Sequence, residues 1–109
     1  MATFKLILEY DGTAYAGWQR QPNQPTVQEA VETAVRSVSQ TAIPVIAAGR
    51  TDAGVHALGQ VVSFITEKSL SSDEWLRALN ATLPEDISAR SVERTDDDFH
   101  ARYSAVRKL

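Results

Sequence analysis

The stretch from Thr26 to Gln40 reads TVQEAVETAVRSVSQ and places its apolar residues at helical spacing. A valine or alanine recurs every three or four positions, so these side chains share one face of a helix. Thr26 and Glu29 have the spacing of a capping box, in which each side chain bonds the backbone N–H of the other residue. The stretch therefore predicts an amphipathic helix that lies across a sheet. Its apolar stripe comprises Val27, Ala30, Val31, Ala34, Val35 and Val38.

A second helix is predicted downstream by the same two signals. Ser71 and Glu74 repeat the spacing of the capping box, and Pro84 stops the helix. Its apolar face carries Trp75, Leu76, Leu79 and Leu83.

Four segments around these helices are predicted to be strands. Residues 3–9 are rich in β-favouring residues, and residues 45–48, 60–65 and 87–93 form the other three apolar runs. The order is strand-helix-strand-strand-helix-strand. This βαββαβ order predicts an α+β, ferredoxin-like sandwich with an antiparallel sheet and both helices on one face.

The composition fits one globular domain over residues 1–109. Hydrophobic residues make up 43% of the chain and charged residues 23%. No apolar run approaches the roughly 20 residues that span a bilayer, and no signal-peptide pattern is present, so we expect a cytoplasmic protein. The chain has no cysteine, which excludes disulfides, thiolate catalysis and zinc-thiolate sites. The net charge of −3 argues mildly against a nucleic-acid partner, although charge has to be judged locally.

The segment 49–57, GRTDAGVHA, joins the second and third predicted strands. It brings together a carboxylate (Asp52), a guanidinium (Arg50) and an imidazole (His56) in a glycine-bracketed turn, which is typical of an active-site loop. Arg50 can keep Asp52 ionised, because two residues apart in an extended segment share a face. The alternative is a plain hairpin connection, with Asp52 in an Asx-type turn and Gly54 at positive φ.

The loop sequence resembles the signature of the TruA-type tRNA pseudouridine synthases. Two further blocks resemble that family in the same order, EYDGTAYAGWQRQ at residues 9–21 and DDFHARYSA at residues 97–105. The resemblance covers nearly the whole chain. It implies that Asp52 is the catalytic residue, as nucleophile or as base, and that neither a cofactor nor a metal is needed. It further implies tRNA as partner, with uridines of the anticodon arm as targets, and a homodimer in the full-length protein.

The resemblance also implies RNA-binding residues. Arg50 enters the space that the flipped base leaves, and further contacts to RNA are predicted for Trp18, Gln19, Arg20, His56 and Arg102. Alternatives stay open for four of them, and for Arg50 the alternative is an ordinary ion pair that stabilises the turn. Trp18 can be an aromatic plug over the core, His56 can be a structural histidine bonded to backbone, and Arg102 can pair with Asp52.

The chain resembles only the N-terminal part of the family, whose members carry a second domain that completes the active-site cleft. We therefore expect the chain to fold but to isomerise uridine poorly or not at all. The alternative function is a non-catalytic ferredoxin-like module that binds RNA or a protein through the open face of its sheet.

Overall fold

The computed structural model describes residues 2–49 and 53–95. Along the chain it contains β1 (Ala2–Tyr10), the 3-10 helix η1 (Gly12–Ala14), α1 (Val27–Ser39), β2 (Ile46–Ala47), β3 (Ala57–Thr66), α2 (Ser72–Thr82) and β4 (Ile87–Thr95). The described helices are too short, and not apolar enough, for any of them to cross a bilayer.

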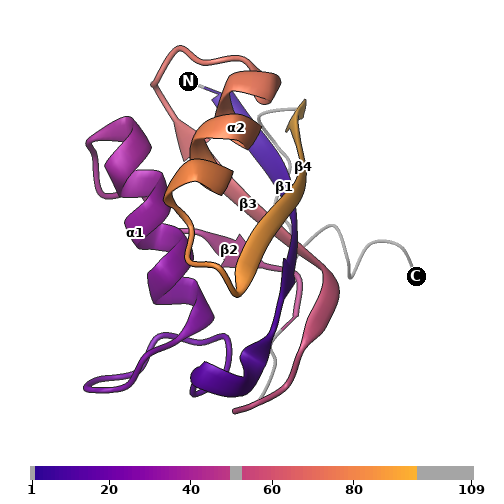
Figure 1. The fold of residues 1–109 in the computed structure, drawn as a ribbon. Coiled ribbons are helices and arrows are strands. Elements are labelled where there is room, and N and C mark those ends of the chain that lie inside the picture. The colour runs from indigo at the N-terminus through magenta and orange to yellow at the C-terminus, as the bar shows by residue number, and fades with distance from the viewer. Residues whose placement is uncertain (1, 50–52, 96–109) are drawn as a thin grey trace.

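The strands form one sheet in the order β2-β3-β1-β4, and all neighbours are antiparallel. Both helices lie on the same side of this sheet (Figure 1). The predicted α+β, ferredoxin-like fold is thereby confirmed. β1 is central, because it pairs with β3 along one edge and with β4 along the other.

The core lies between the helices and the inner face of the sheet. Alternate residues of β1 point inward, as the period of two in a strand requires. At one end of the sheet Phe4, Phe64 and Trp75 form an aromatic cluster, with ring centroids 5.0–6.0 Å apart. The buried residues that complete the core include Leu6, Leu8, Val27, Val31, Val35, Val62 and Leu79.

The two predicted capping boxes turn out differently. At α2 the box is complete, because Ser71 Oγ accepts from Glu74 N–H (3.1 Å) and Glu74 Oε1 accepts from Ser71 N–H (2.9 Å). At α1, Thr26 Oγ1 accepts from Glu29 N–H (3.3 Å), but the Glu29 carboxylate pairs with Arg20 instead (3.2 Å). The second half of that predicted box is therefore wrong, because a nearby guanidinium competes for the carboxylate.

Strand bounds differ modestly from the prediction. β2 covers only Ile46–Ala47, because the N–H of Val45 donates to Glu32 Oε2 (3.0 Å) and Pro44 has no N–H to offer. β3 begins earlier than predicted, where Ala57 pairs with Tyr10 beyond an irregularity in register.

Candidate active site

The predicted catalytic loop is described up to Gly49 and again from Ala53. Arg50 and Asp52 lie outside the described residues, and so does Arg102. The described segments on either side of residues 50–52 are held by contacts to β3 and to the turn after β1.

The upstream side of the loop is fixed to β3. Ala48 N–H donates to the carbonyl of Val61 (2.9 Å), and the side-chain amide of Gln60 donates to the carbonyl of Gly49 (2.8 Å). The chain therefore enters residues 50–52 from a backbone held against the third strand.

The downstream side packs against the turn that follows β1. Gly54, which has a φ of 78°, donates its N–H to the carbonyl of Tyr15 (3.2 Å). Gly12 is buried against Val55 so closely that a Cβ added to it would lie 1.9 Å from the Val55 carbonyl oxygen. Only glycine fits at that position, because the neighbour is backbone and cannot swing away. The positive φ of Gly54 also agrees with the predicted turn geometry.

His56 adds a side-chain contact to this junction. Its Nδ1 accepts a hydrogen bond from the N–H of Gly12 (2.8 Å). An Nδ1 that accepts this bond carries a lone pair and no proton. Asp11 Oδ1 also lies 3.2 Å from Nδ1, but it cannot bond a nitrogen that carries no proton. The structural alternative for His56, a bond to backbone near the start of a strand, is thus realised.

The Asp11 carboxylate has its own partners within the turn. Its Oδ1 accepts from Thr13 Oγ1 (2.6 Å) and from Thr13 N–H (2.9 Å). These two bonds, the side-chain one first, hold the pKa of Asp11 below its ordinary value. The carboxylate therefore stays ionised at neutral pH and orders the first turn of η1.

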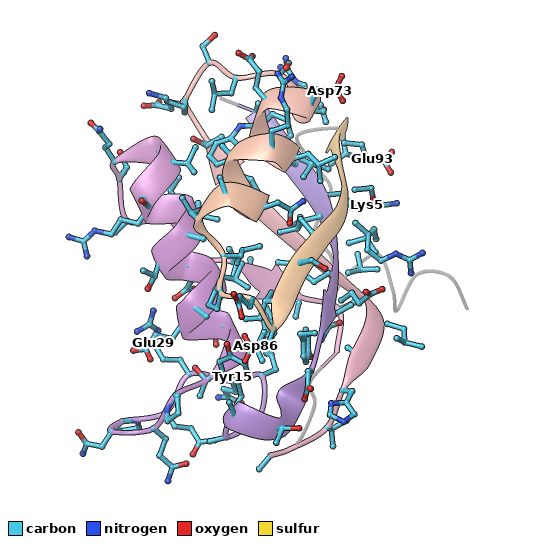
Figure 2. All side chains as sticks on the ribbon, in the orientation of Figure 1. Lys5, Tyr15, Glu29, Asp73, Asp86 and Glu93 are labelled. Carbon is cyan, nitrogen blue, oxygen red and sulfur yellow. The ribbon has the colours of Figure 1, made fainter. Side chains whose placement is uncertain are left out.

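The same turn is tied on its far side to the connection between α2 and β4. Tyr15 Oη donates to Asp86 Oδ1 (2.6 Å), and Asp11 N–H donates to the Asp86 carbonyl (2.9 Å). Figure 2 shows Tyr15 and Asp86 side by side. Burial, and then the bond to the Asp86 carboxylate, raise the pKa of the Tyr15 hydroxyl above its ordinary value. No signal in the sequence singles out Asp86, because it lies 71 positions from its partner.

Three other predicted RNA-binding residues lie in the loop that leads to α1. Trp18 is only 4% exposed and belongs to the core, which agrees with the aromatic-plug alternative and leaves little ring surface for a base. The guanidinium of Arg20 bonds Glu29 (3.2 Å) and Glu32 (2.7 Å), so its charge is compensated within the protein. Gln19 is exposed. Contacts of these residues to RNA stay predictions.

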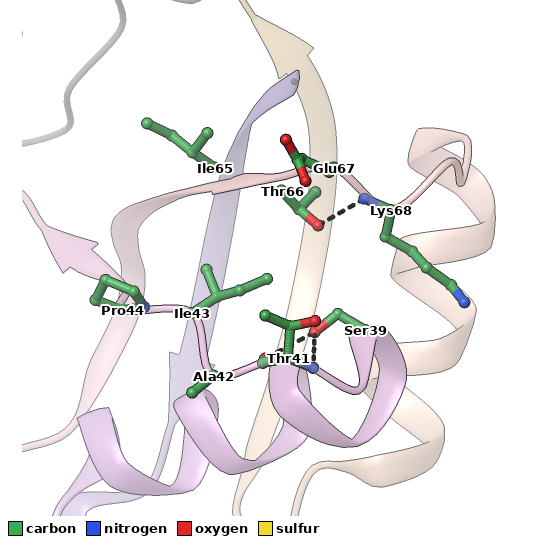
Figure 3. A pocket seen from close by; sticks show the side chains of 9 residues that line it. All are labelled: Ser39, Thr41, Ala42, Ile43, Pro44, Ile65, Thr66, Glu67 and Lys68. Carbon is green, nitrogen blue, oxygen red and sulfur yellow. Dashed lines mark hydrogen bonds between the residues drawn. The ribbon is translucent and has the colours of Figure 1, made fainter.

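Hollows lie both near the turn after β1 and elsewhere, and one of about 410 Å³ beside the turn is lined in part by Tyr10, Asp11 and Asp86. Figure 3 shows a hollow between the end of α1 and the end of β3, at the opposite end of that strand from His56. Its volume is about 420 Å³. Its polar groups bond one another, as Ser39 does with Thr41 (3.2 Å) and Thr66 with Lys68 (3.0 Å). Within residues 2–49 and 53–95, no three His, Asp or Glu side chains gather as metal ligands do.

Comparison with known proteins identifies the family. A family model described as tRNA pseudouridine synthase matches residues 6–104. Among curated relatives named tRNA pseudouridine synthase A, that of Acetivibrio thermocellus is 49% identical over 108 residues, which cover 99% of this chain and 44% of the relative. That of Geobacillus kaustophilus is 53% identical over 105 residues, 95% of this chain and 41% of the relative.

A third relative, from Nitrosomonas eutropha, is 52% identical over 103 residues, 94% of this chain and 37% of the relative. The chain thus spans well under half the length of the curated relatives it matches. The similarity runs through all three blocks that carried the resemblance in the sequence. The chain belongs to the tRNA pseudouridine synthase family.

Proposed function

We propose that this chain supplies the catalytic loop of an enzyme that converts uridine into pseudouridine in tRNA, with Asp52 as the catalytic carboxylate. The observation that carries the proposal is the GRTDAGVHA segment, which stands in a chain of this family and is anchored on both sides of Asp52. Membership of the family supports the reaction class, an isomerisation without net oxidation or hydrolysis.

The reaction breaks the bond between ribose C1′ and N1 of uracil and forms one between C1′ and C5. The proton lost from C5 is balanced by one gained at N1, so no redox partner is required. An anionic group has to attack or deprotonate the nucleoside, and the detached base has to be retained and turned. A carboxylate suits either role, and Asp52 is the carboxylate of the loop.

The described anchors lie on either side of Asp52, and the downstream one begins at Gly54, two positions further along the chain. Gly54 is bonded to Tyr15, at the end of the sheet where β1 ends and β3 begins. We infer that the target uridine is brought to this end of the sheet, with Arg50 beside Asp52 to favour its ionised form and to fill the gap left by the flipped base.

The finer assignments rest on the resemblance. We propose that the uridines are those of the anticodon arm, that the complete enzyme is a cytoplasmic homodimer, and that Arg102 contributes to the cleft. Because relatives are more than twice as long as the matched segment, we propose that the remaining part of the enzyme completes the uracil pocket. This chain alone is then expected to be poorly active or inactive.

The test is pseudouridine formation in unmodified tRNA. The chain would be compared with the same chain followed by its natural downstream sequence, each with Asp52 intact, Asp52→Asn and Asp52→Ala. We expect activity in the longer intact protein and a loss of at least about 10²–10⁴-fold in both variants, since removing a proton-transferring or nucleophilic group costs that much. Binding of tRNA, measured in parallel, should change little.

Two results would contradict the proposal. Full activity in Asp52→Ala would show that the carboxylate has no part in the chemistry. Absence of activity in both intact proteins, with tRNA or a protein still bound, would favour the non-catalytic binding module.

A further inference from the structure

We propose that Gly12 and His56 are positioning residues, which dock the segment after Asp52 onto the turn after β1 and thereby set where the carboxylate lies. The inference rests on the proposed role of Asp52. The YDGT block at residues 10–13 is thereby given a positioning role in the same site.

The first argument is steric. Gly12 approaches the backbone of Val55 so closely that an added Cβ would fall 1.9 Å from its carbonyl oxygen and 2.6 Å from its carbonyl carbon. Any side chain at position 12 would push the loop away from the turn. By contrast, a Cβ on Gly49, Gly54 or Gly59 would meet nothing within 4 Å. The close contact is therefore specific to the point where the loop docks.

The second argument is the bond to the imidazole. The N–H of Gly12 points at His56 Nδ1 (2.8 Å), and Gly54 N–H bonds the carbonyl of Tyr15 (3.2 Å). Two bonds and one close backbone contact thus join three consecutive loop residues to one turn. That turn is itself held to Asp86 by two further bonds of 2.6 and 2.9 Å.

The third argument is the short reach between this junction and the carboxylate. Only Ala53 separates Asp52 from Gly54, so we expect a change in this docking to alter the placement of the carboxylate. A misplacement of about 1 Å can cost about 100-fold in rate. The contact should therefore act on the chemical step and not on tRNA affinity.

The test exploits the difference between the two nitrogens of His56. In His56→Asn the side-chain oxygen, which is attached to Cγ as Nδ1 is, can accept from Gly12. In His56→Gln the amide is one methylene longer and reaches toward the position of Nε2. His56→Ala removes both. All three would be made in the longer protein that carries activity, together with Gly12→Ala and, as a matched glycine control, Gly59→Ala.

We expect kcat to fall about 10–100-fold in His56→Ala, His56→Gln and Gly12→Ala while KM for tRNA stays within about twofold. His56→Asn should keep most of the activity, and Gly59→Ala should keep the stability of the parent. A rise of KM with unchanged kcat, or better rescue by glutamine than by asparagine, would overturn the proposal in favour of a phosphate contact through Nε2. Unchanged kinetics in all three variants would overturn it as well.

A second measurement needs no activity and guards against misfolding of Gly12→Ala. Nitrogen-15 NMR of this chain at neutral pH reports which ring nitrogen of His56 bears the proton, and His56→Asn assigns the signal against His100. We expect the proton on Nε2 and a hydrogen-bonded Gly12 amide. A proton on Nδ1 would overturn the proposal, whereas activity retained in Asp52→Ala would overturn the proposed function itself, so the two failures are distinguishable.

Discussion

The two ends of the sheet are held together by different forces. At the end where β1 begins, Phe4, Phe64 and Trp75 are at most 1% exposed and pack ring against ring. At the end where β1 finishes, the buried Tyr10 and Ile87 are accompanied by hydrogen bonds between turns, among them the bond from Tyr15 to Asp86. Apolar packing is strong but tolerates adjustment, whereas hydrogen bonds fix direction. We infer that the end where β1 begins contributes most to the stability of the fold. The end where β1 finishes fixes the geometry of the turns.

The largest effect on stability is expected at the end where Phe4, Phe64 and Trp75 pack together, the apolar end. Trp75→Ala should lower the free energy of unfolding by about 3–5 kcal/mol, because it leaves a cavity beside Phe4 and Phe64. Trp75→Phe should cost less, since the buried indole N–H has no hydrogen-bond partner among residues 2–49 and 53–95 to lose. Urea denaturation measures both. Leu58→Ala, at a side chain 75% exposed, is the control and should change the free energy by less than about 0.5 kcal/mol.

If Trp75→Ala cost no more than the Leu58 control, the aromatic cluster would not be the source of stability and the contrast between the two ends would fail.

A smaller effect on stability is expected at the end where Tyr15 bonds Asp86, the polar end. Tyr15→Phe removes the bond to the Asp86 carboxylate (2.6 Å) and should lower stability by about 1–2 kcal/mol, a value reduced for partial exposure to solvent. The pKa of Tyr15 is raised in the folded state. Its contribution is therefore fully present below the ordinary tyrosine pKa of about 10 and is lost as pH rises above it.

Denaturation of the parent and of Tyr15→Phe between pH 7 and pH 11 measures this difference. The gap in stability between the two proteins should be constant up to about pH 10 and then shrink. A gap that widened in alkali would mean that the hydroxyl bond is not what holds the turn.

The smallest effects on stability are expected at the helix starts. They sharpen the comparison because α1 and α2 begin at different ends of the sheet. Ser71→Ala at α2 removes the side-chain bond of a complete capping box, and Thr26→Ala at α1 removes the one bond that the threonine side chain makes to Glu29. Each should cost about 1 kcal/mol, with Ser71→Ala the more costly of the two. Thermal unfolding measures both. The reverse order would show that the Arg20 pair, and not the threonine, fixes the start of α1.

The cap at α2 also predicts a dependence on acid. Bonds from the backbone and then from the side chain of Ser71 lower the pKa of Glu74 below 4.5. A lowered pKa stabilises the fold above the ordinary value and loses that contribution as pH falls through the folded one. The difference in stability between the parent and Glu74→Gln, which cannot titrate at this position, should therefore shrink in acid.

The fold could be predicted because its signals are local. The valine and alanine stripe of α1 and the two Ser/Thr-x-x-Glu patterns depend on residues three or four positions apart, and a helix brings such residues together wherever it lies. The failures are contacts across the chain. Arg20 pairs with Glu29, and the N–H of Val45 donates to Glu32. Both contacts join separate segments, so the spacing of residue types along the sequence does not reveal them.

The candidate site divides in the same way. A motif could single out Asp52, Arg50 and His56, because the chemistry of those residue types is visible in sequence. The docking of Gly12 on Val55 and the Tyr15–Asp86 bond could not be foreseen, since the first depends on backbone approach and the second on a loop 71 residues away. The burial of Trp18 could not be predicted either, because an aromatic residue beside a glycine has the same sequence signature whether it is buried or exposed.

The central place of β1 has a consequence for how the chain acquires its structure during synthesis. β1 is made before the other described strands, yet Tyr10 pairs with Ala57 and with Ile87, and Thr3 pairs with Ile65 and Thr95. Neither edge of β1 can be covered until those later residues leave the ribosome. Such distant pairings fold slowly, and an uncovered strand is prone to associate with other chains. β1 is therefore the segment for which we most expect protection by a chaperone during synthesis.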